Sequence, residues 1–352
     1  MDPATSDVST DLKTLEEKVR KAALPEELSE RIIIRLGQLA KIVSSPSFLP
    51  ELDSIERYVD WIVNLPWNTK TKDVLDLEFA KKVLDQHHFG LTEIKERVAE
   101  YLAVMKLKEQ KGETGDVYRA PILCFVGLVG TGKTTIAYSI AEALGRKIAR
   151  IPFGGMGDPL DLRGQSRMHP EAEPGKIIKA LRTCGSRNPV ILLDEIDRVT
   201  DAGRASIMGV LVELLDPGQN YAFTDHYLDF PFNLSETLFI ATANNTTNIA
   251  TAVLDRLEPI MMPSYTDVEK ITIGKSYVFP KALKDAGLTA DAVQIDDQVW
   301  ANIVRPLGFD SGIRTLERNI AGIVRKVARH VVEGKVQSVK LTPENVKEYL
   351  PQ

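Results

Sequence analysis

Several features that would mark a special class of protein are scarce in this sequence of 352 residues. Its only cysteines, Cys124 and Cys184, are too few for a disulfide framework and indicate buried free thiols in a reducing compartment. No apolar run approaches the ~18–20 residues that cross a bilayer, and the start has no secretory-signal pattern. The formal net charge of −5 offers no overall positive field to nucleic acid or an anionic membrane. These absences predict a cytoplasmic protein with neither a membrane nor a nucleic-acid partner.

The length and composition are those of a folded protein with more than one domain. Hydrophobic residues make up 43% of the chain and charged residues 26%, which is ordinary for globular proteins. A chain of 352 residues is long enough for two or three domains that each bury a core. We expect a helical amino-terminal segment at 1–72, a large α/β domain at 73–264 and a smaller, mainly helical domain at 265–352.

Helical periodicity dominates both ends of the chain. Apolar residues spaced three and four apart predict helices within 11–45, 55–67, 77–110, 267–335 and 343–350. Residues 69–73, TKTKD, are interpreted as an exposed hinge between helices. A short strand is expected at 338–342.

Four short apolar runs set the middle of the chain apart. They are PILCFV, KIARIPF, VILLD and TLFIAT, which begin at residues 121, 147, 190 and 237 and are separated by helical patterns. Such near-continuous apolar strands are typical of a parallel sheet whose two faces are covered by helices. The expected fold class is therefore α/β.

A glycine-rich stretch, GLVGTGKTT, follows the first of these strands and opens a helical pattern. Its first eight residues fit G-x-x-x-x-G-K-[ST], the pattern of a phosphate-binding P-loop. Glycines let backbone N–H groups turn toward one point, and the start of the next helix adds partial positive charge. Lys133 can reach the β and γ phosphates of ATP, and the Thr134 hydroxyl can ligate Mg²⁺. The nucleotide-binding residues expected here are Gly127, Leu128, Val129, Gly130, Thr131, Gly132, Lys133, Thr134 and Thr135.

An acidic pair stands at the end of the strand VILLD. At the carboxyl edge of a parallel sheet, Asp194 can hold the Mg²⁺ together with Thr134. Glu195 can orient or deprotonate the attacking water. The alternative is a pair that only caps a helix, but a P-loop about sixty residues earlier favours a catalytic pair.

Three later segments resemble parts of AAA+ ATPases. TLFIATANN is similar to the sensor strand of that family, which implies that Asn244 bridges the carboxylates and the γ-phosphate. LDRLEPI resembles the arginine-finger segment, which implies that Arg256 reaches the nucleotide of the next subunit. SGIRTLERNI resembles the second sensor, which implies that Arg314 touches the γ-phosphate held by its own subunit. The implied fold is a P-loop AAA+ parallel sheet followed by a small helical domain.

Longer stretches are similar to the Lon family of ATP-dependent proteases. They include YVDWIVNLPWN, HHFGLTEIKERVAEYLAVMKLK, IPFGGMGDPLDLRGQSR and GIRTLERNIAGIVRKVA. The resemblance runs from about residue 28 to the end and implies an ATPase module preceded by part of the family's helical amino-terminal region. It also implies an adenine pocket lined by His88, Phe89, Gly90 and Leu91.

The chain departs from the family in its expected pore loop, which would contact substrate. The stretch RMHPEAEPG has the usual length, and the resemblance places the loop at Met168, His169, Pro170 and Glu171. A histidine stands where the family carries an aromatic residue, which weakens the expected grip on unfolded chains.

Two further departures concern the P-loop and the end of the chain. Leu128 and Val129 replace two prolines that are usual in the family, but the phosphate contacts are made by backbone and should survive. The family's serine–lysine protease domain would begin near Gln352. We expect the sequence to be an excised piece rather than a natural protein without a protease, because both ends fall at plausible domain edges.

These features together predict an ATP-driven motor that unfolds and translocates unfolded or damaged proteins. The implied assembly is a homo-hexameric ring in which Arg256 of one subunit completes the site of the next. Two alternatives stay open. The histidine in the pore loop favours a nucleotide-gated scaffold with little turnover. A nucleic-acid-directed AAA+ ATPase shares the same core, but the acidic balance argues against it.

Overall fold

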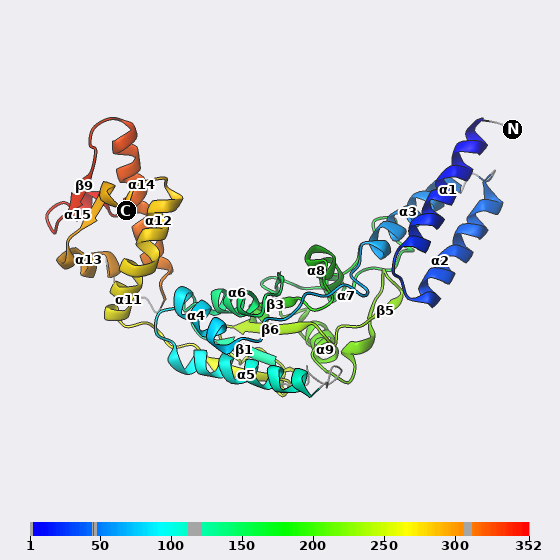
Figure 1. The fold of residues 1–352 in the computed structure, drawn as a ribbon, viewed down its shortest axis with the longest axis horizontal. Helices are drawn as coiled ribbons and strands as arrows, with labels where there is room; N and C mark the ends of the chain where they lie inside the picture. The colour runs from blue at the N-terminus through cyan, green and yellow to red at the C-terminus, as the bar shows by residue number, and fades with distance from the viewer. Residues whose placement is uncertain (1–2, 44, 46–47, 112–121, 306–311, 352) are drawn as a thin grey trace. The chain divides into compact units, whose positions relative to one another are not determined.

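A computed structural model describes residues 3–43, 45, 48–111, 122–305 and 312–351 (Figure 1). The chain divides into two compact units, which are described one at a time. The first unit comprises Met1–Leu75, Tyr101–Cys124 and Ala141–Pro259. The second unit comprises Asp76–Glu100, Phe125–Ile140 and Ile260–Gln352. Within the described ranges, the helices are all too short or too polar to cross a bilayer. The predicted domain boundaries at 72 and 264 stay predictions.

Three helices open the first unit and pack on one another: α1 (Pro3–Lys21), α2 (Glu26–Leu39) and α3 (Phe48–Val63) (Figure 1). Each turns an apolar stripe inward, as the spacing predicts, and side chains such as Val19 and Ile62 are fully buried. The third helix begins at Phe48, earlier than its predicted start at 55.

A five-stranded sheet has the order β2-β3-β6-β1-β7. β2 pairs with β3 and β3 with β6 in parallel register. All four predicted strands are present, which confirms the α/β fold. The edge strand β7 was not predicted, because its sequence LEPIM contains Pro259, a residue that sheets tolerate at an edge. The strands are β1 (Ile122–Val126), β2 (Ile148–Pro152), β3 (Val190–Asp194), β6 (Leu238–Ala243) and β7 (Leu257–Met261).

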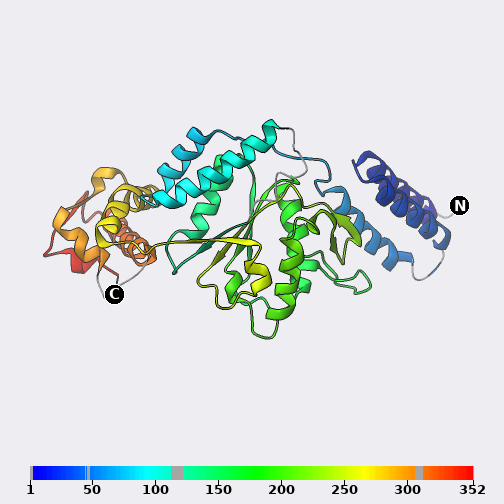
Figure 2. The ribbon, with the colours of Figure 1, turned by 90° about the horizontal axis from the view of Figure 1, so that it is seen from below.

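Helices flank this sheet (Figure 2). α8 illustrates how the sequence builds them: Ile177, Leu181 and Cys184 share one buried face, and Gly185 ends the helix with a φ of 58°. α8 packs against β2. The helices between the amino-terminal segment and β7 are α4 (Leu77–His87), α5 (Thr92–Gln110), α6 (Lys133–Leu144), α7 (Leu160–Arg163), α8 (Lys176–Cys184), α9 (Arg204–Leu214) and α10 (Thr251–Leu254).

A small antiparallel hairpin of β4 (Phe223–Asp225) and β5 (Phe230–Phe232) projects from the first unit. Its strands are three residues long, too short for a periodic signal, and were not predicted. Trp67 packs against Phe230 and Phe232, with ring centroids 6.0 and 4.9 Å apart. The hairpin therefore joins the amino-terminal segment to the region of the sheet.

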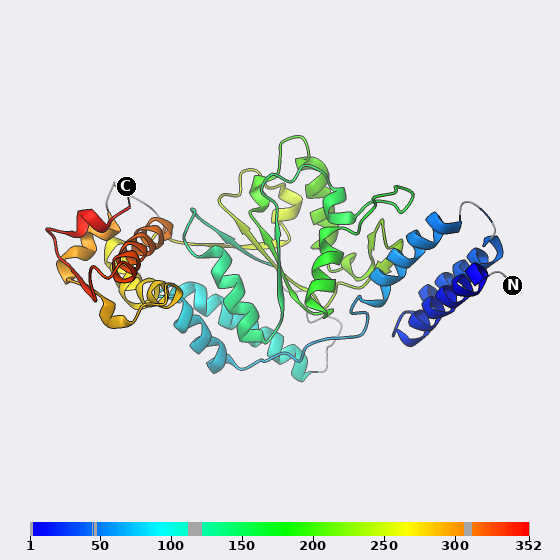
Figure 3. The same cartoon turned by 90° about the horizontal axis from the view of Figure 1, so that it is seen from above.

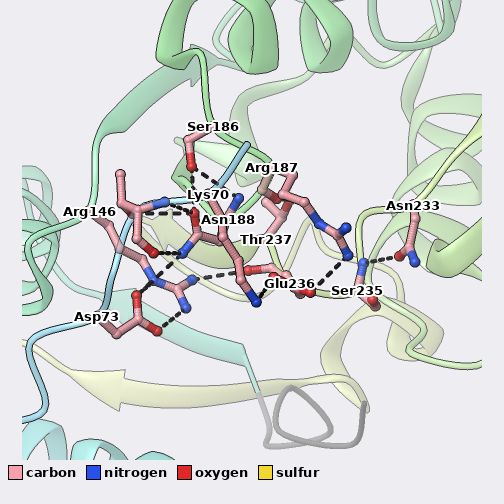
Figure 4. A network of polar contacts seen from close by, with 11 residues as sticks. Lys70, Asp73, Arg146, Ser186, Arg187, Asn188, Asn233, Ser235, Glu236 and Thr237 are labelled. Carbon is pink, nitrogen blue, oxygen red and sulfur yellow. Dashed lines mark hydrogen bonds and ion pairs between the residues drawn. The ribbon is translucent and has the colours of Figure 1, made fainter. Parts of the chain in front are cut away.

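In the segment predicted as an exposed hinge at 69–73, Thr69, Lys70 and Lys72 are exposed, while Thr71 and Asp73 take part in a polar network (Figure 4). Asp73 binds Arg146 at two points, Oδ1 to Nε at 2.7 Å and Oδ2 to Nη2 at 2.6 Å. Asn188 accepts from Thr71 N at 2.9 Å and donates to Thr71 O at 2.8 Å. The Arg146 side chain is fully buried, and breaking a buried ion pair of this kind costs about 3–5 kcal/mol. Local composition could not reveal partners more than 70 residues away.

The carboxy-terminal part of the second unit is mainly helical, as predicted (Figure 3). Its core contains Trp300, Ile320 and Ile323. The strand predicted at 338–342 is β9, which pairs in parallel with an unpredicted strand, β8. The elements are α11 (Asp267–Ile273), a π-helical turn at Gly274–Val278, α12 (Phe279–Asp285), β8 (Val293–Ile295), α13 (Trp300–Val304), α14 (Arg314–Val332), β9 (Val339–Leu341) and α15 (Val346–Tyr349).

Candidate functional site

The glycine-rich loop lies between β1 and α6, as its motif predicts, and side chains of the loop hold its backbone. Lys133, the first residue of α6, donates from Nζ to Gly127 O at 2.7 Å and to Leu128 O at 2.9 Å. Thr131 Oγ1 donates to Leu128 O at 2.9 Å, and Thr135 Oγ1 donates to Gly132 O at 2.8 Å. These side chains therefore fix the backbone of the loop from within.

Two glycines in this loop adopt backbone conformations that other residues rarely reach. Gly130 has a φ of 83° and Gly132 a φ of 94°. A third glycine is required for space, because a Cβ on Gly127 would lie 2.7 Å from Met262 O. The backbone of the loop is therefore free of side chains at these positions, as a phosphate cradle needs.

The residues before α14 pack directly on this loop within the second unit. The Ile313 N–H donates to Gly130 O at 3.1 Å, and Gly312 has room for no Cβ, which would lie 2.4 Å from Val129 O. Arg314 is exposed, and its Cγ lies 3.3 Å from where a Gly130 Cβ would be. The predicted second sensor thus stands beside the predicted phosphate loop.

Tyr265 also braces the loop and was missed by sequence reasoning. Its hydroxyl donates to Thr131 O at 3.2 Å. Burial, followed by the charge of Glu269, raises the pKa of Tyr265 to about 12, so the phenol stays a donor at neutral pH. Tyr265 follows a loop after β7, and neither periodicity nor motif marked it.

The acidic pair lies at the carboxyl end of β3. Asp194 is buried, with 3% of its surface exposed, and its Oδ1 accepts from Thr242 Oγ1 at 2.5 Å. Thr242 Oγ1 also accepts from the Glu195 N–H at 2.9 Å. Glu195 has a φ of 58° and a ψ of 50°, a left-handed conformation that is uncommon outside glycine and is found at functional sites. The Thr242 hydroxyl therefore holds both acidic residues in place.

Two charged neighbours of this pair were also missed. Arg150 on β2 binds Asp194 Oδ2, with Nε at 2.7 Å and Nη2 at 2.6 Å. Asp197 Oδ1 accepts from the Asn244 N–H at 3.0 Å, which places the predicted sensor beside the turn after β3. The available signal was that polar residues at the carboxyl ends of adjacent parallel strands share one edge.

Arg256, the predicted arginine finger, is engaged within its own chain. Its Nη2 binds Asp216 Oδ2 at 2.9 Å and its Nη1 donates to Ala252 O at 2.6 Å. The hydrogen bond from Arg256 is the main cause that lowers the pKa of Asp216. About a quarter of each side chain stays exposed, 27% for Arg256 and 25% for Asp216.

The predicted adenine-pocket residues follow α4. His88 is buried, and its Nε2 lies 2.9 Å from Ser139 Oγ on α6. Burial, with added repulsion from Lys95 and His87, lowers the pKa of His88 to about 4. Phe89, Gly90 and Leu91 are half-buried, and Gly90 and Leu91 have φ values of 63° and 53°. Whether these residues line an adenine pocket stays a prediction.

The predicted pore loop is exposed throughout. The four residues Met168, His169, Pro170 and Glu171 are all exposed, and Met168 shows 91% of its surface. Two hydrogen bonds between residues close in sequence shape its tip. The His169 N–H donates to Ser166 O at 3.0 Å, and the Ala172 N–H donates to His169 O at 3.1 Å. An exposed loop of this kind is able to contact a macromolecule, and its role stays a prediction.

In the described residues, no group of three or more His, Cys, Asp or Glu side chains could hold a metal by itself. A P-loop magnesium site does not need one, because a hydroxyl, a single carboxylate and the phosphates of the nucleotide supply the oxygens. Thr134 and Asp194 offer these oxygen donors, and their pairing stays a prediction.

Comparison with known families identifies two parts of the chain. Residues 123–265 match the family model described as ATPase family associated with various cellular activities (AAA). Residues 284–339 match the model described as Lon protease AAA+ ATPase lid domain. The first match covers β1 to the end of the sheet, and the second covers most of the carboxy-terminal helical region.

Curated relatives carry the name Lon protease. The chain is 43% identical over 338 residues to Lon protease 2 of Thermus thermophilus, across 95% of this chain and 42% of that protein. It is 42% identical over 333 residues to Lon protease of Desulforamulus reducens, across 94% of this chain and 40% of that protein. For Lon protease 1 of Bacillus subtilis the identity is 41% over 341 residues, across 97% and 43%. The chain thus spans about two fifths of the length of these relatives.

Proposed function

Because this chain belongs to the AAA+ ATPases of the Lon family, we propose that it is a motor module that hydrolyses ATP and thereby unfolds and translocates protein substrates toward a protease chamber. The observation that carries the proposal is the pair Asp194 and Glu195, held by Thr242 at the end of β3, in a chain with a formed P-loop. Both motifs follow strands of one sheet.

The loop 127–135 fits a triphosphate. Its backbone carries no side chain at Gly130 and Gly132, so N–H groups are available to phosphate oxygens. Lys133 donates to two loop carbonyls, and its ammonium group can turn to the β and γ phosphates once they arrive. Arg314 is exposed beside Gly130 and can add a second positive charge.

Magnesium would be held by the Thr134 hydroxyl and the Asp194 carboxylate, which are the hard oxygen donors that this ion prefers. When bound, the ion supplies charge neutralisation of the phosphates. Asp194 now accepts from Thr242 and Arg150, so its carboxylate is held in position. Arg150 would release one oxygen of Asp194 to the ion.

Glu195 is proposed to orient the attacking water and accept its proton. The carboxylate is partly exposed, at 27% of the side chain, and Arg198 lies 3.5 Å from it. The left-handed backbone of Glu195 aims the side chain differently from that of Asp194, which suits two separate roles. Asn244, fixed through its N–H to Asp197, is proposed to hold the water or the γ-phosphate from the next strand.

Arg256 is proposed to act on the nucleotide of a neighbouring subunit in a hexameric ring. In one chain it is neutralised by Asp216, and assembly would exchange that carboxylate for phosphate. An arginine supplied by a neighbour is worth about 10³–10⁵ in rate in other phosphoryl-transfer systems. A lone subunit should therefore turn over slowly.

The test measures phosphate release against protein concentration for the wild type and two variants. We expect specific activity to rise with concentration, Glu195→Gln to bind ATP but lose turnover by about a thousandfold, and Arg256→Ala to remove the concentration dependence while sparing ATP affinity. Asp201→Asn, which changes a carboxylate with 91% of its side chain exposed in the β3–α9 connection, is the control. Unchanged hydrolysis by Glu195→Gln would overturn the catalytic assignment.

A second candidate is a nucleotide-gated scaffold with little turnover. His169, Pro170 and Glu171 at the tip of the exposed loop favour it, and so does the Arg256–Asp216 pair, which keeps the predicted finger occupied. Activity that stays low and flat at all protein concentrations, with tight ATP binding, would select the scaffold.

A further inference from the structure

The exposed loop 165–174 leaves the core through a narrow neck of two glycines, Gly164 and Gly175. A Cβ on Gly175 would lie 2.0 Å from Leu162 O and 2.7 Å from Gly164 N. Gly164 has a φ of 72°, in the region that favours glycine. The two ends of the loop are thus pressed together, and any side chain at the neck would force them apart.

A buried carboxylate fills the space beside this neck. Asp225, at the end of β4, has no exposed surface. Its Oδ2 accepts from the Gly175 N–H at 2.7 Å, and its Oδ1 accepts from the N–H groups of Tyr227 at 2.8 Å and Leu228 at 3.2 Å. One side chain therefore ties the end of the exposed loop to the turn of the β4–β5 hairpin.

The hairpin and the loop both contact α3, so the loop, the hairpin and α3 are connected to one another. Tyr58 donates from its hydroxyl to Leu228 O at 2.9 Å. The Arg167 guanidinium lies 3.8 Å from the centre of the Tyr58 ring, and Arg57 Nη1 donates to Pro170 O at 3.4 Å. The loop is thus held at its neck by Asp225 and along its length by α3, through partners that lie 50 to 113 residues away in the sequence.

We propose that Asp225 is a positioning residue that holds the exposed loop 165–174 in one pose against α3, so that the loop can transmit ATP-driven movement to a polypeptide. The second half of this proposal rests on the proposed function. The Asp225 carboxylate bonds to Gly175, Tyr227 and Leu228, none of which belongs to the P-loop, the β3 carboxylates or Arg256, so its removal should leave basal ATP turnover intact.

The chemistry of the carboxylate makes asparagine an informative replacement. Both carboxylate oxygens accept hydrogen bonds, whereas an amide offers one oxygen and one N–H donor. In Asp225→Asn, either the Gly175 N–H or the N–H groups of the hairpin turn lose their oxygen acceptor. The side-chain NH₂ of asparagine then faces a backbone N–H, and two donors meet. Burial raises the pKa of Asp225 despite these bonds, so loss of the charge also relieves a desolvation cost and the variant should fold.

The first measurement does not depend on ATP. Trypsin cleavage after Arg167 is followed by mass spectrometry of the released peptide in the wild type, Asp225→Asn and Asp229→Asn. Asp229 is an exposed carboxylate of the same hairpin and serves as the control. We expect cleavage to accelerate about tenfold in Asp225→Asn, as loss of one buried hydrogen bond implies, and to stay unchanged in Asp229→Asn. Equal rates in Asp225→Asn and the wild type would overturn the proposal.

The second measurement tests transmission. ATP turnover is titrated with reduced and carboxymethylated α-lactalbumin, a permanently unfolded polypeptide. We expect Asp225→Asn to raise the polypeptide KM about tenfold while basal turnover stays the same. Faster trypsin cleavage with an unchanged KM would refute transmission through this loop. A wild type that no polypeptide stimulates would instead refute the proposed function, while the cleavage result still decides the role of Asp225.

A milder variant keeps the proposal falsifiable if Asp225→Asn fails to fold. Tyr58→Phe removes the hydroxyl that donates to Leu228 O and keeps the ring beneath Arg167. We expect about threefold faster cleavage after Arg167. Cleavage at the wild-type rate would show that the contact between Tyr58 and the hairpin does not hold the loop.

Discussion

The loop 127–135 and the loop 165–174 are both shaped by glycines, yet different contacts hold them. In the first, Lys133, Thr131 and Thr135 bond to carbonyls no more than six residues away, and two remote groups, the Tyr265 hydroxyl and the Ile313 N–H, add to these local bonds. In the second, the neck is tied to Asp225 and the tip to Arg57, across 50 and 113 residues. A short sequence motif is enough to predict a loop held by local bonds. A loop held by distant residues can be described only once the chain has folded around it.

The difference suits two kinds of work. A phosphate site needs fixed backbone groups before the ligand arrives, and local bonds provide them at small entropic cost because little chain is closed. A loop that is to move with a larger body gains from being attached to that body, here the β4–β5 hairpin and α3. A motif of neighbouring residues therefore predicts the first loop, whereas the contacts that hold the second loop are visible only in the folded chain.

The largest expected effect in this comparison is a loss of ATP binding at the first loop alone. Lys133→Ala should weaken ATP binding about a hundredfold, or about 2.7 kcal/mol, because a charge-assisted contact to phosphate is lost. The loop backbone should persist, since Thr131 still bonds Leu128 O. Isothermal titration with MgATP measures the affinity, with exposed Lys147→Ala as control. A matching change in trypsin cleavage after Arg167 would contradict the independence of the two loops.

A smaller effect concerns a remote contact of α6, the helix that follows the first loop, between His88 and Ser139. His88 has a folded pKa of about 4, below the ordinary 6.5. The unfolded chain therefore takes up a proton between these values and the folded chain does not, so stability falls as pH drops through this window. From pH 7.5 to 5 this residue alone should lower the free energy of unfolding by about 2 kcal/mol.

Urea denaturation of the wild type and His88→Gln at both pH values measures this difference. The variant should lose about 2 kcal/mol less on acidification, because glutamine does not titrate. An identical pH dependence in the two proteins would contradict the neutral, buried state of His88.

The smallest expected effect sharpens the account of the second loop. Arg167→Ala removes the guanidinium from the Tyr58 ring, a contact worth about 0.5–1 kcal/mol. Hydrogen exchange of the backbone amides of Met168, His169 and Glu171 should become about two- to fivefold faster. Arg20→Ala, which removes an exposed arginine from α1, should leave these amides unchanged. Equal acceleration by both variants would show that the Tyr58 contact does not hold the loop.

Much of the fold was predictable because its signals are local. The strands of VILLD and TLFIAT are continuous apolar runs, and the helix pattern of α14 recurs over 19 residues. The β4–β5 hairpin and β8 escaped prediction because three residues carry little periodic pattern, although the equally short β9 was predicted. In the segment 69–73, Thr69, Lys70 and Lys72 are exposed as predicted, but the partners of Thr71 and Asp73, which are Asn188 and Arg146, lie far along the chain and could not be predicted.

The candidate site divides in the same way. Lys133, Asp194 and Glu195 could be predicted as site residues because the motif of a phosphate loop and an acidic pair each occupy a short stretch with fixed order. Thr242 and Arg150 were missed, since only the pairing of β3 with its neighbours on both sides brings them to Asp194. Arg256 was predicted by resemblance, but its contact with Asp216 was visible only in the structure.

By itself, the sequence determined that this protein has a parallel α/β sheet with a phosphate loop and an acidic strand end, because period, glycine placement and residue order are properties of neighbouring positions. Only the tertiary structure decided that Thr242 holds the acidic pair and that Asp225 and α3 hold the exposed loop. Those contacts join residues 47 to 113 positions apart. Chain folding, rather than local preference, selects which of many possible distant partners come within bonding distance.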